Sequence, residues 1–179
     1  MRRSSGRAFF EMVGAKEARA LIKRHEHLGT CGNASLFVAL RDPAGRVQSL
    51  VGFGHGPHAA GADAVLERGY TRRRAPPNTG SYLIGRPLRY GARVFGWRSV
   101  KAFSDPRFGE AGLIYRAAGF RPAGPSAHGK PWRYGLLDGG RVLSDRAIYR
   151  RHGSHAAARA AGAELIKVPA RRAWEWTAP

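Results

Sequence analysis

Short apolar stretches separated by turn residues run along the chain and predict alternating strands and helices. The segment 15–28 has helical spacing, with a predicted face of Ala18, Leu21, Ile22 and His25. Further helices are expected at 78–90, 112–118 and 154–162. Strands are expected where apolar residues alternate or run together, at 9–13, 35–41, 47–54, 64–71, 98–104, 133–137, 141–148, 165–168 and 174–176.

Turn and capping residues divide these elements. Asp42–Gly45 is typical of a tight turn, and Asp138–Gly140 predicts a hairpin between its flanking strands. Asn78 is a favourable N-cap for the helix that follows, whereas Pro87 is expected to kink or end that helix. Early hairpins and a later strand–helix alternation predict one mixed α/β (α+β) domain over residues 1–179, a length that one core accommodates.

The net charge adds a prediction about the partner. With 31 Lys and Arg residues against 12 Asp and Glu residues, the chain has a net charge of +19. A polyanion is the expected partner, because each neutralised phosphate releases condensed counterions. A GC-rich genome explains the preference for Arg over Lys, but it does not explain the scarcity of acidic residues. Nucleic acid is therefore the predicted partner.

Other whole-chain features concern the cellular compartment. No apolar run approaches the roughly 18 residues that a membrane span needs. Glu11 and Lys16 interrupt any stretch that resembles a signal peptide. Cys31 is the sole cysteine of the sequence, so an internal disulfide cannot form. These features predict a cytoplasmic protein without a membrane partner.

The stretch from Leu66 to Phe120 contains the candidate chemistry. A strand leads to a double proline, and Asn78–Ser81 then opens a helix. The free N–H groups and the dipole at a helix start attract anions, and Gly80 has no Cβ to keep a phosphate away. Most capped helices bind nothing, so this feature alone is weak evidence for a phosphate site.

The residues that surround this helix resemble a known family. The following strand ends in Ser104-Asp105, a turn contains Gly109, and Ile114–Phe120 reads IYRAAGF. This pattern resembles the GNAT acyltransferases and, within them, the phage Mom-like DNA-modification proteins, and its other matching residues are Arg68, Asn78 and Ser81. The resemblance is good over about residues 64–124 and loose elsewhere, including a C-terminal hairpin, helix and closing strands at 132–179.

The resemblance implies a fold and a donor. The fold is a splayed, mixed central sheet flanked by helices, in which the fourth and fifth strands part to admit an acyl thioester. Acetyl-CoA or another acyl-CoA is the implied donor, and its pyrophosphate would be held by Asn78, Thr79, Gly80 and Ser81. These four residues meet the usual GNAT loop pattern, Gln/Arg-x-x-Gly-x-Gly/Ala, only in part.

The resemblance also implies catalytic residues. Asp105, with Ser104 before it, is the candidate general base, and the alternative is a plain turn residue before Pro106. Tyr115 is the candidate acid that protonates the departing sulfur, and the alternative is a core aromatic. Arg68 is implied to contact the substrate or a cofactor phosphate, and the alternative is a solvated charge on a strand.

Basic and aromatic residues near these motifs suit a nucleic acid, because rings stack an extruded base and guanidinium groups hold its backbone. The predicted contacts are Arg68, Tyr70, Arg72, Arg73, His25 and His27. Solvated histidines and core aromatics are the alternatives. The two histidines lie two apart on a helix, so they cannot chelate one metal in the i, i+4 manner, and no metal site is predicted.

The expected function is acyl transfer to an exocyclic amine of a DNA base. Adenine in phage DNA is the first candidate, with the target base flipped out of double-stranded DNA. Two alternatives stay open. One is acylation of an amine on a hypermodified thymine or on RNA, and the other is a basic nucleic-acid-binding protein without catalysis.

Overall fold

The chain folds into two compact units in the computed structural model, which describes residues 8–25, 31–55, 61–126 and 129–179. The larger unit spans residues 1–103, 112–122 and 174–179, and the smaller unit spans 104–111 and 123–173. The predicted division into a core at 64–124 and a C-terminal part at 132–179 stays a prediction.

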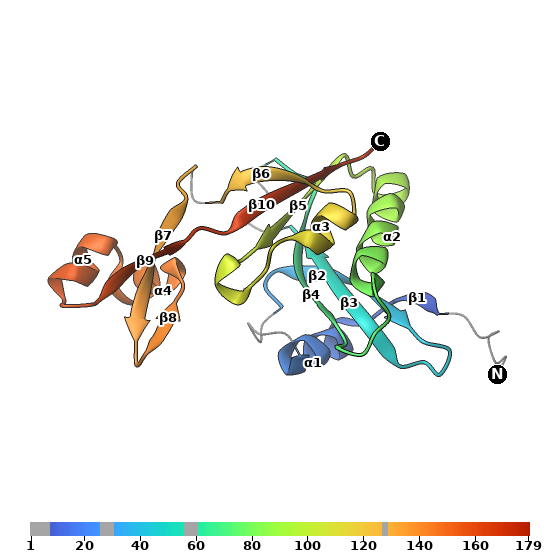
Figure 1. Ribbon diagram of the computed structural model, residues 1–179, viewed down its shortest axis with the longest axis horizontal. Helices are drawn as coiled ribbons and strands as arrows, with labels where there is room; N and C mark the ends of the chain where they lie inside the picture. Colours follow the sequence, from blue (N-terminus) through green and yellow to red (C-terminus); the bar gives the residue numbers. More distant parts are fainter. Residues whose placement is uncertain (1–7, 26–30, 56–60, 127–128) are drawn as a thin grey trace. The chain divides into compact units, whose positions relative to one another are not determined.

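The larger unit contains most of a seven-stranded mixed sheet with the order β1-β2-β3-β4-β5-β10-β6 (Figure 1). Strands β1 to β4 pair as antiparallel neighbours, and α2 connects β4 to its parallel neighbour β5. The elements of this sheet and its helices are β1 (Phe9–Met12), α1 (Ala15–His25), β2 (Ala34–Arg41), β3 (Val47–Gly54), β4 (Ala64–Thr71), α2 (Thr79–Val94), β5 (Ser99–Ser104), α3 (Leu113–Ala117), β6 (Arg121–Pro125) and β10 (Arg172–Thr177).

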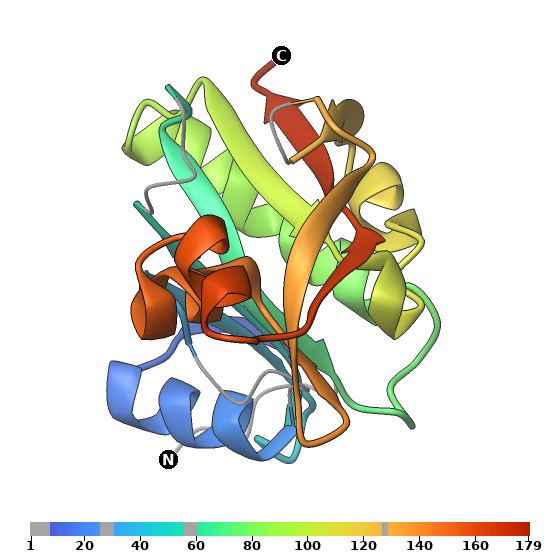
Figure 2. The ribbon, with the colours of Figure 1, turned by 90° about the vertical axis from the view of Figure 1, so that its left-hand side faces the viewer.

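Helices cover both faces of this sheet. Side chains of a strand point alternately to opposite faces, so residues of one strand can pack against two different helices. On β2, Phe37 and Ala39 pack with Ile22 of α1. Leu40 of the same strand packs with Leu88 of α2 in a second cluster, which extends to β5 and β10. The two helices therefore lie on opposite sides of the sheet, with α1 in blue and α2 in green (Figure 2).

The smaller unit contains a three-stranded sheet with the order β8-β7-β9. Leu136 of β7 packs with Ile148 of α4 and Ala158 of α5, so both helices share one core with the sheet. The elements of this unit are η1 (Pro106–Phe108), β7 (Trp132–Asp138), β8 (Arg141–Leu143), α4 (Asp145–His152), α5 (His155–Ala160) and β9 (Leu165–Pro169).

The predicted mixed α/β sheet with flanking helices is confirmed, with three local corrections. The strand expected at 141–148 ends at Leu143, because α4 begins at Asp145 behind an extended Ser144. Helix α2 continues past Pro87 to Val94, since its buried apolar face compensates for the hydrogen bond that proline removes. β6 was not expected, because its proline and glycine residues are typical of loops, although the end of a sheet tolerates proline.

Helices in the described part of the chain are too short or too polar to cross a membrane.

Candidate active site

The central strands β4 and β5 of the larger unit part from each other. Their parallel pairing covers three residue pairs and stops at Leu66 and Ala102. Both strands continue beyond that point, β4 to Thr71 and β5 to Ser104. Beyond Leu66, the edge of β4 is therefore no longer hydrogen-bonded to β5. This is the splay that the resemblance implies, at the predicted pair of strands.

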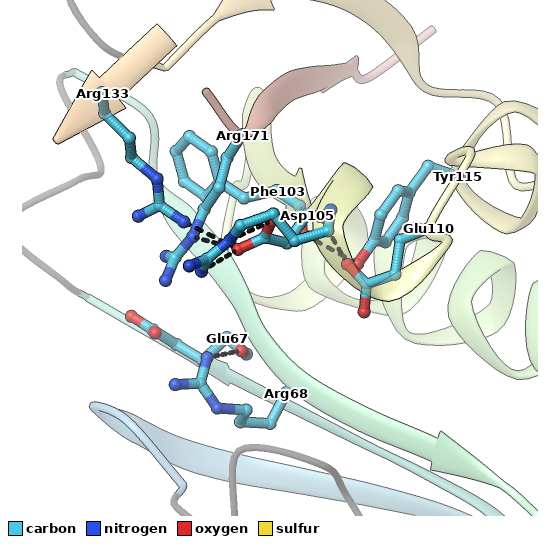
Figure 3. A network of polar contacts seen from close by, with 9 residues as sticks. Glu67, Arg68, Phe103, Asp105, Glu110, Tyr115, Arg133 and Arg171 are labelled. Atoms are coloured by element: carbon cyan, nitrogen blue, oxygen red, sulfur yellow. Dashed lines mark hydrogen bonds and ion pairs between the residues drawn. The ribbon is translucent and has the colours of Figure 1, made fainter. Parts of the chain in front are cut away.

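A β-bulge lies in β4 where the splay begins. Phe53 of β3 pairs with Leu66, and the neighbouring Gly52 pairs with Arg68, so Glu67 is an extra residue on β4. An extra residue of this kind loses its place in the ladder and bends the strand. The Arg68 side chain folds back, and its Nη1 donates a hydrogen bond to the Glu67 carbonyl (Figure 3). Arg68 thus holds the bulge, a role that sequence reasoning did not predict.

Tyr115 places a hydroxyl beside β5. Its Oη donates a hydrogen bond of 3.3 Å to the carbonyl of Phe103, the residue that follows the last β5 residue paired with β4 (Figure 3). The ring of Tyr115 lies 5.7 Å from that of Phe120 and 6.0 Å from that of Trp174. The tyrosine is therefore partly a core aromatic, and it also presents its hydroxyl to the strand that borders the splay.

Helix α2 begins close to the end of β4. Asn78 stands at its N-cap in the left-handed conformation (φ 61°), and its side chain makes no capping hydrogen bond to the described residues. The Thr79 hydroxyl is buried and donates to the Pro76 carbonyl at 2.6 Å. The Ser81 hydroxyl donates to the Asn78 carbonyl at 3.1 Å. The side chains of this turn mostly shape the turn, and the N–H groups of a helix's first turn lack partners within the helix.

Packing explains why a residue without a Cβ stands at position 80. A Cβ at this position would lie 2.5 Å from Cδ1 of Ile114 on α3 and 2.9 Å from Oγ1 of Thr71 at the end of β4. The space beside its Cα is therefore filled by protein and is not open to a phosphate. Gly80 allows α2, α3 and β4 to approach one another, and phosphate binding by its backbone N–H stays a prediction.

Two of the predicted nucleic-acid contacts, His25 and Tyr70, lie together in the larger unit. The His25 ring of α1 stacks on the Tyr70 ring of β4 at 5.1 Å, with 29° between the ring planes. Burial raises the pKa of the Tyr70 hydroxyl, and the charges of Arg72 and Arg41 oppose that rise. Arg72 and Arg73 are exposed in the turn after β4, whereas His27 lies outside the described residues.

Asp105, in the smaller unit, is the centre of an ion-pair cluster. Arg107 holds its carboxylate with two side-chain bonds, from Nε at 3.0 Å and Nη2 at 2.7 Å. Arg133 Nη2 donates at 2.7 Å, and Arg171 Nε lies at 3.6 Å (Figure 3). The Glu110 carboxylate accepts from the backbone N–H of Asp105 at 2.6 Å. Three guanidinium groups thus converge on one carboxylate.

This environment makes Asp105 a weak proton acceptor. Burial raises the pKa of the carboxyl, but the hydrogen bonds and charge of Arg107 and the charge of Arg133 lower it by more, so the net shift is downward. A general base at neutral pH works best with a pKa near 7. The base role predicted for Asp105 is untested, and this electrostatic environment disfavours it. Ser104, the other predicted catalytic residue on this strand end, is fully buried.

The sequence reasoning missed the arginines of this cluster as site residues. None of the three arginines was predicted as a site residue from the sequence. Arg107 could have been found from Asp105-Pro106-Arg107, because an Asp side chain commonly accepts from the backbone two residues later, as it does here at 3.2 Å. Arg133 and Arg171 are far away in sequence, and a local signal for them does not exist. A cluster of potential metal ligands does not occur among the described residues.

Comparison with known proteins gives matches to structures only. The sequence matches no protein-family model and no curated protein. A spermidine N-acetyltransferase from Vibrio cholerae, solved with CoA and spermine, matches with a TM-score of 0.52 and 10% identity, over 95% of each chain. A dodecameric structure of spermidine N-acetyltransferase from the same organism gives a TM-score of 0.56 at 10% identity, over 95% of this chain and 93% of that one.

A protein assigned as a phosphinothricin N-acetyltransferase matches over 97% of this chain and 99% of its own, with a TM-score of 0.53 and 14% identity. At such low identities the likeness concerns the fold and not the substrate. In this chain, the part that matches these structures includes the splay between β4 and β5, the bulge beside it and the helix that starts at Thr79. The chain therefore has the fold of the GNAT-type N-acetyltransferases.

Proposed function

We propose that this protein is an N-acyltransferase that uses an acyl-CoA donor and modifies an exocyclic amine of a base in DNA, in the manner of the Mom-like proteins. The observation that carries the catalytic part is the splay between β4 and β5. A bulge lies on one of its strands and the Tyr115 hydroxyl beside the other, at Phe103. The bulge and the Tyr115 hydroxyl thus lie at the two strands of the splay in the larger unit.

The residues of the larger unit fit an acyl-CoA. The first turn of α2 offers N–H groups that lack partners within the helix, and the dipole of a 16-residue helix favours an anion there. Residues Gly80 and Ser81 would supply such donors to the pyrophosphate, while Thr79 and the left-handed Asn78 shape the turn. When bound, the thioester supplies an acyl carbon that an amine nitrogen can attack as the carbon–sulfur bond breaks.

The protein's own groups would assist this reaction in two ways. The N–H groups of the bulge at Glu67 can donate to an acyl oxygen as negative charge develops on it, and such preorganised donors are often the largest catalytic contribution. The Tyr115 hydroxyl can give its proton to the departing thiolate sulfur. In the structure this hydroxyl donates to the Phe103 carbonyl at 3.3 Å, on the strand that borders the splay.

Charge supports a polyanion rather than a polyamine as the acceptor. The spermidine N-acetyltransferase that shares this fold is described with the polycation spermine. A chain with a net charge of +19 repels a polycation and attracts nucleic acid. The stack of His25 on Tyr70 adds a ring pair of the kind that binds unstacked bases. The charge and the ring pair support the DNA assignment.

An exocyclic amine of adenine is a demanding acceptor, because its lone pair is delocalised into the ring. Positioning must therefore supply much of the rate enhancement. Inside a duplex the amine is paired, so the base would have to leave the stack before transfer. We expect the base to enter at the splay, where β4 and β5 are no longer paired.

Mass spectrometry of nucleosides tests the proposal. The full-length protein is incubated with acetyl-CoA and double-stranded DNA, and nucleosides from cells that express it are analysed in parallel. An acyl-sized mass gain on deoxyadenosine is the expected result. A gain on a modified thymidine or on RNA nucleosides would move the substrate to one of the alternatives. An unchanged nucleoside profile with tight DNA binding would indicate a binder without catalysis and overturn the proposal.

A further inference from the structure

The Asp105 cluster of the smaller unit has more cationic groups than its carboxylate can pair with. Arg107, Arg133 and Arg171 each carry a full positive charge and five N–H donors. The Asp105 carboxylate has about four acceptor positions, and Arg107 uses two of them with its side chain. The side chains are also shielded from water, with exposed fractions of 16% for Arg107, 13% for Arg133 and 29% for Arg171.

Arg133 shows this excess most clearly. Its Nε is buried and has no hydrogen-bond partner among the described residues. Burial lowers the pKa of the Arg133 guanidinium, the charges of Arg171 and Arg107 lower it further, and the charges of Asp105 and Asp145 oppose this shift. A buried donor without a partner is rare in native proteins and often marks the place of a missing water or ion. A second anion beside these arginines would compensate both the charge and the unpaired donor.

We propose that Arg107, Arg133 and Arg171 form a binding site for a phosphate group of the nucleic-acid backbone, with Asp105 as a positioning residue that holds their guanidinium groups in place. The inference rests on the proposed function for the identity of the nucleic acid. Guanidinium groups suit this ligand because their fork of donors matches the oxygens of a phosphate. Asp105 holds the guanidinium groups in place before a phosphate binds, so less side-chain entropy is lost on binding.

The phosphate of a nucleic acid is favoured over a phosphate of coenzyme A. The three arginines all belong to the smaller unit. That unit contains eleven Lys and Arg residues against five Asp and Glu residues, so its overall field attracts a polyanion.

The test measures how salt changes the affinity for DNA. Binding of a fluorescently labelled short duplex to the full-length protein is followed between about 50 and 200 mM salt. Arg171→Gln is the main variant, because Arg171 is the most exposed of the three arginines. Arg150→Gln is the matched control, since Arg150 is an exposed arginine on α4 of the same unit and lies outside the cluster. Thermal unfolding of each variant establishes that it is folded.

The expected result is a salt slope that is smaller by about 1 in Arg171→Gln, with about tenfold weaker binding, and an unchanged slope in Arg150→Gln. If Arg171→Gln does not fold, Arg171→Lys keeps the charge without the fork and is expected to weaken binding in the same direction. Equal losses in both glutamine variants would overturn the proposal, because they would indicate a diffuse field and not a site.

Coenzyme A binding distinguishes the two sources of phosphate. An unchanged DNA slope in Arg171→Gln together with weaker coenzyme A binding would assign the arginines to the donor and overturn the proposal. The outcome is also separable from that of the proposed function. A changed slope without any base modification would keep this phosphate site and reject the acyltransferase activity. Base modification with an unchanged slope would reject the site alone.

Discussion

In the larger unit, the polar groups beside β5 are backbone groups and the Tyr115 hydroxyl, whereas the smaller unit gathers charged side chains around Asp105. The first arrangement is set by strand pairing, because the bulge and the splay follow from the register of β3, β4 and β5. The second is set by ion pairs, and Asp105 is its centre. In the proposed function the larger unit supplies groups that respond to charge developing during a reaction, and in the proposed phosphate site the smaller unit supplies groups that recognise charge already present.

This difference changes the interpretation of Asp105. An Asp at the end of β5 suggests a catalytic base from its position alone, but the arginines around it stabilise its ionised form. The same stabilisation makes it a strong anchor for cations. A residue with a strongly perturbed pKa is a candidate for function, and the direction of the shift indicates which function. Here the downward shift favours anchoring over proton abstraction.

Replacing Asp105 is expected to give the largest effect on stability. Asp105→Asn keeps the shape of the side chain but leaves three partly buried arginines without their anion. Losing one partner of a buried ion pair costs about 3 kcal/mol or more in the free energy of unfolding. Chemical denaturation of the wild type and the variant measures it. A variant of native stability that has lost only its acyl-transfer rate would instead support the base role.

The pH dependence of this stability gives a second check. The folded-state pKa of Asp105 is lowered from 3.8, so its stabilisation is fully present above that value and is lost as pH falls through the folded-state pKa. The difference in unfolding free energy between wild type and Asp105→Asn should be constant from about pH 7 to 5 and shrink below about pH 4. A difference that shrinks already near neutral pH would contradict a lowered pKa.

Tyr115→Phe tests the larger unit by removing one hydroxyl. If Tyr115 protonates the leaving sulfur, the rate of acyl transfer should fall by roughly 10²-fold while coenzyme A and DNA affinities stay unchanged. The ring contacts with Phe120 and Trp174 remain, so the fold should persist. Tyr149→Phe is the control, because Tyr149 is an exposed tyrosine on α4. Full activity of Tyr115→Phe would leave this tyrosine as a core aromatic alone.

Much of the fold could be predicted from the sequence, because its signals are local. The bounds of β3 and β4 were predicted as observed, since continuous apolar runs between clear turn residues define buried strands. The segment 141–148 was misassigned, because Ile148 and Tyr149 suit a strand as well as the apolar face of a short helix. Sequence periodicity over eight residues does not separate these two cases.

The site was predictable only where it depends on neighbours in sequence. Tyr115 and the start of α2 were predicted from local motifs. The ion pairs of Asp105 with Arg133 and Arg171 join residues 28 and 66 positions away, and the bulge at Glu67 requires the register of a pairing partner. One of the arginines, Arg107, belongs to a local turn motif. The pairing of Asp105 with Arg133 and Arg171, and of β3 with β4 at the bulge, leaves no periodic or local signal in the sequence.

The smallest expected effect concerns how the larger unit packs around the start of α2. Gly80 and Gly85 belong to the same helix, but a Cβ at Gly80 would meet Ile114 at 2.5 Å, whereas one at Gly85 would lie 3.5 Å from the Arg89 side chain. Replacing a helical glycine by alanine stabilises by up to about 1 kcal/mol where space allows. Gly85→Ala should therefore stabilise the protein by about that amount. Gly80→Ala should destabilise it by about 1 kcal/mol, because the overlap outweighs the gain in helix propensity.

A double mutant locates this overlap. Ile114→Val removes the Cδ1 atom that a Cβ at Gly80 would meet first, so the combination with Gly80→Ala should be more stable than the sum of the single variants by about 1 kcal/mol. Denaturant unfolding of the four proteins gives this coupling energy, and Gly85→Ala combined with Ile114→Val should give none. Additive effects at Gly80 would mean that α2 and α3 do not meet there. In that case the space beside Gly80 would be open to a phosphate, as the sequence alone suggested.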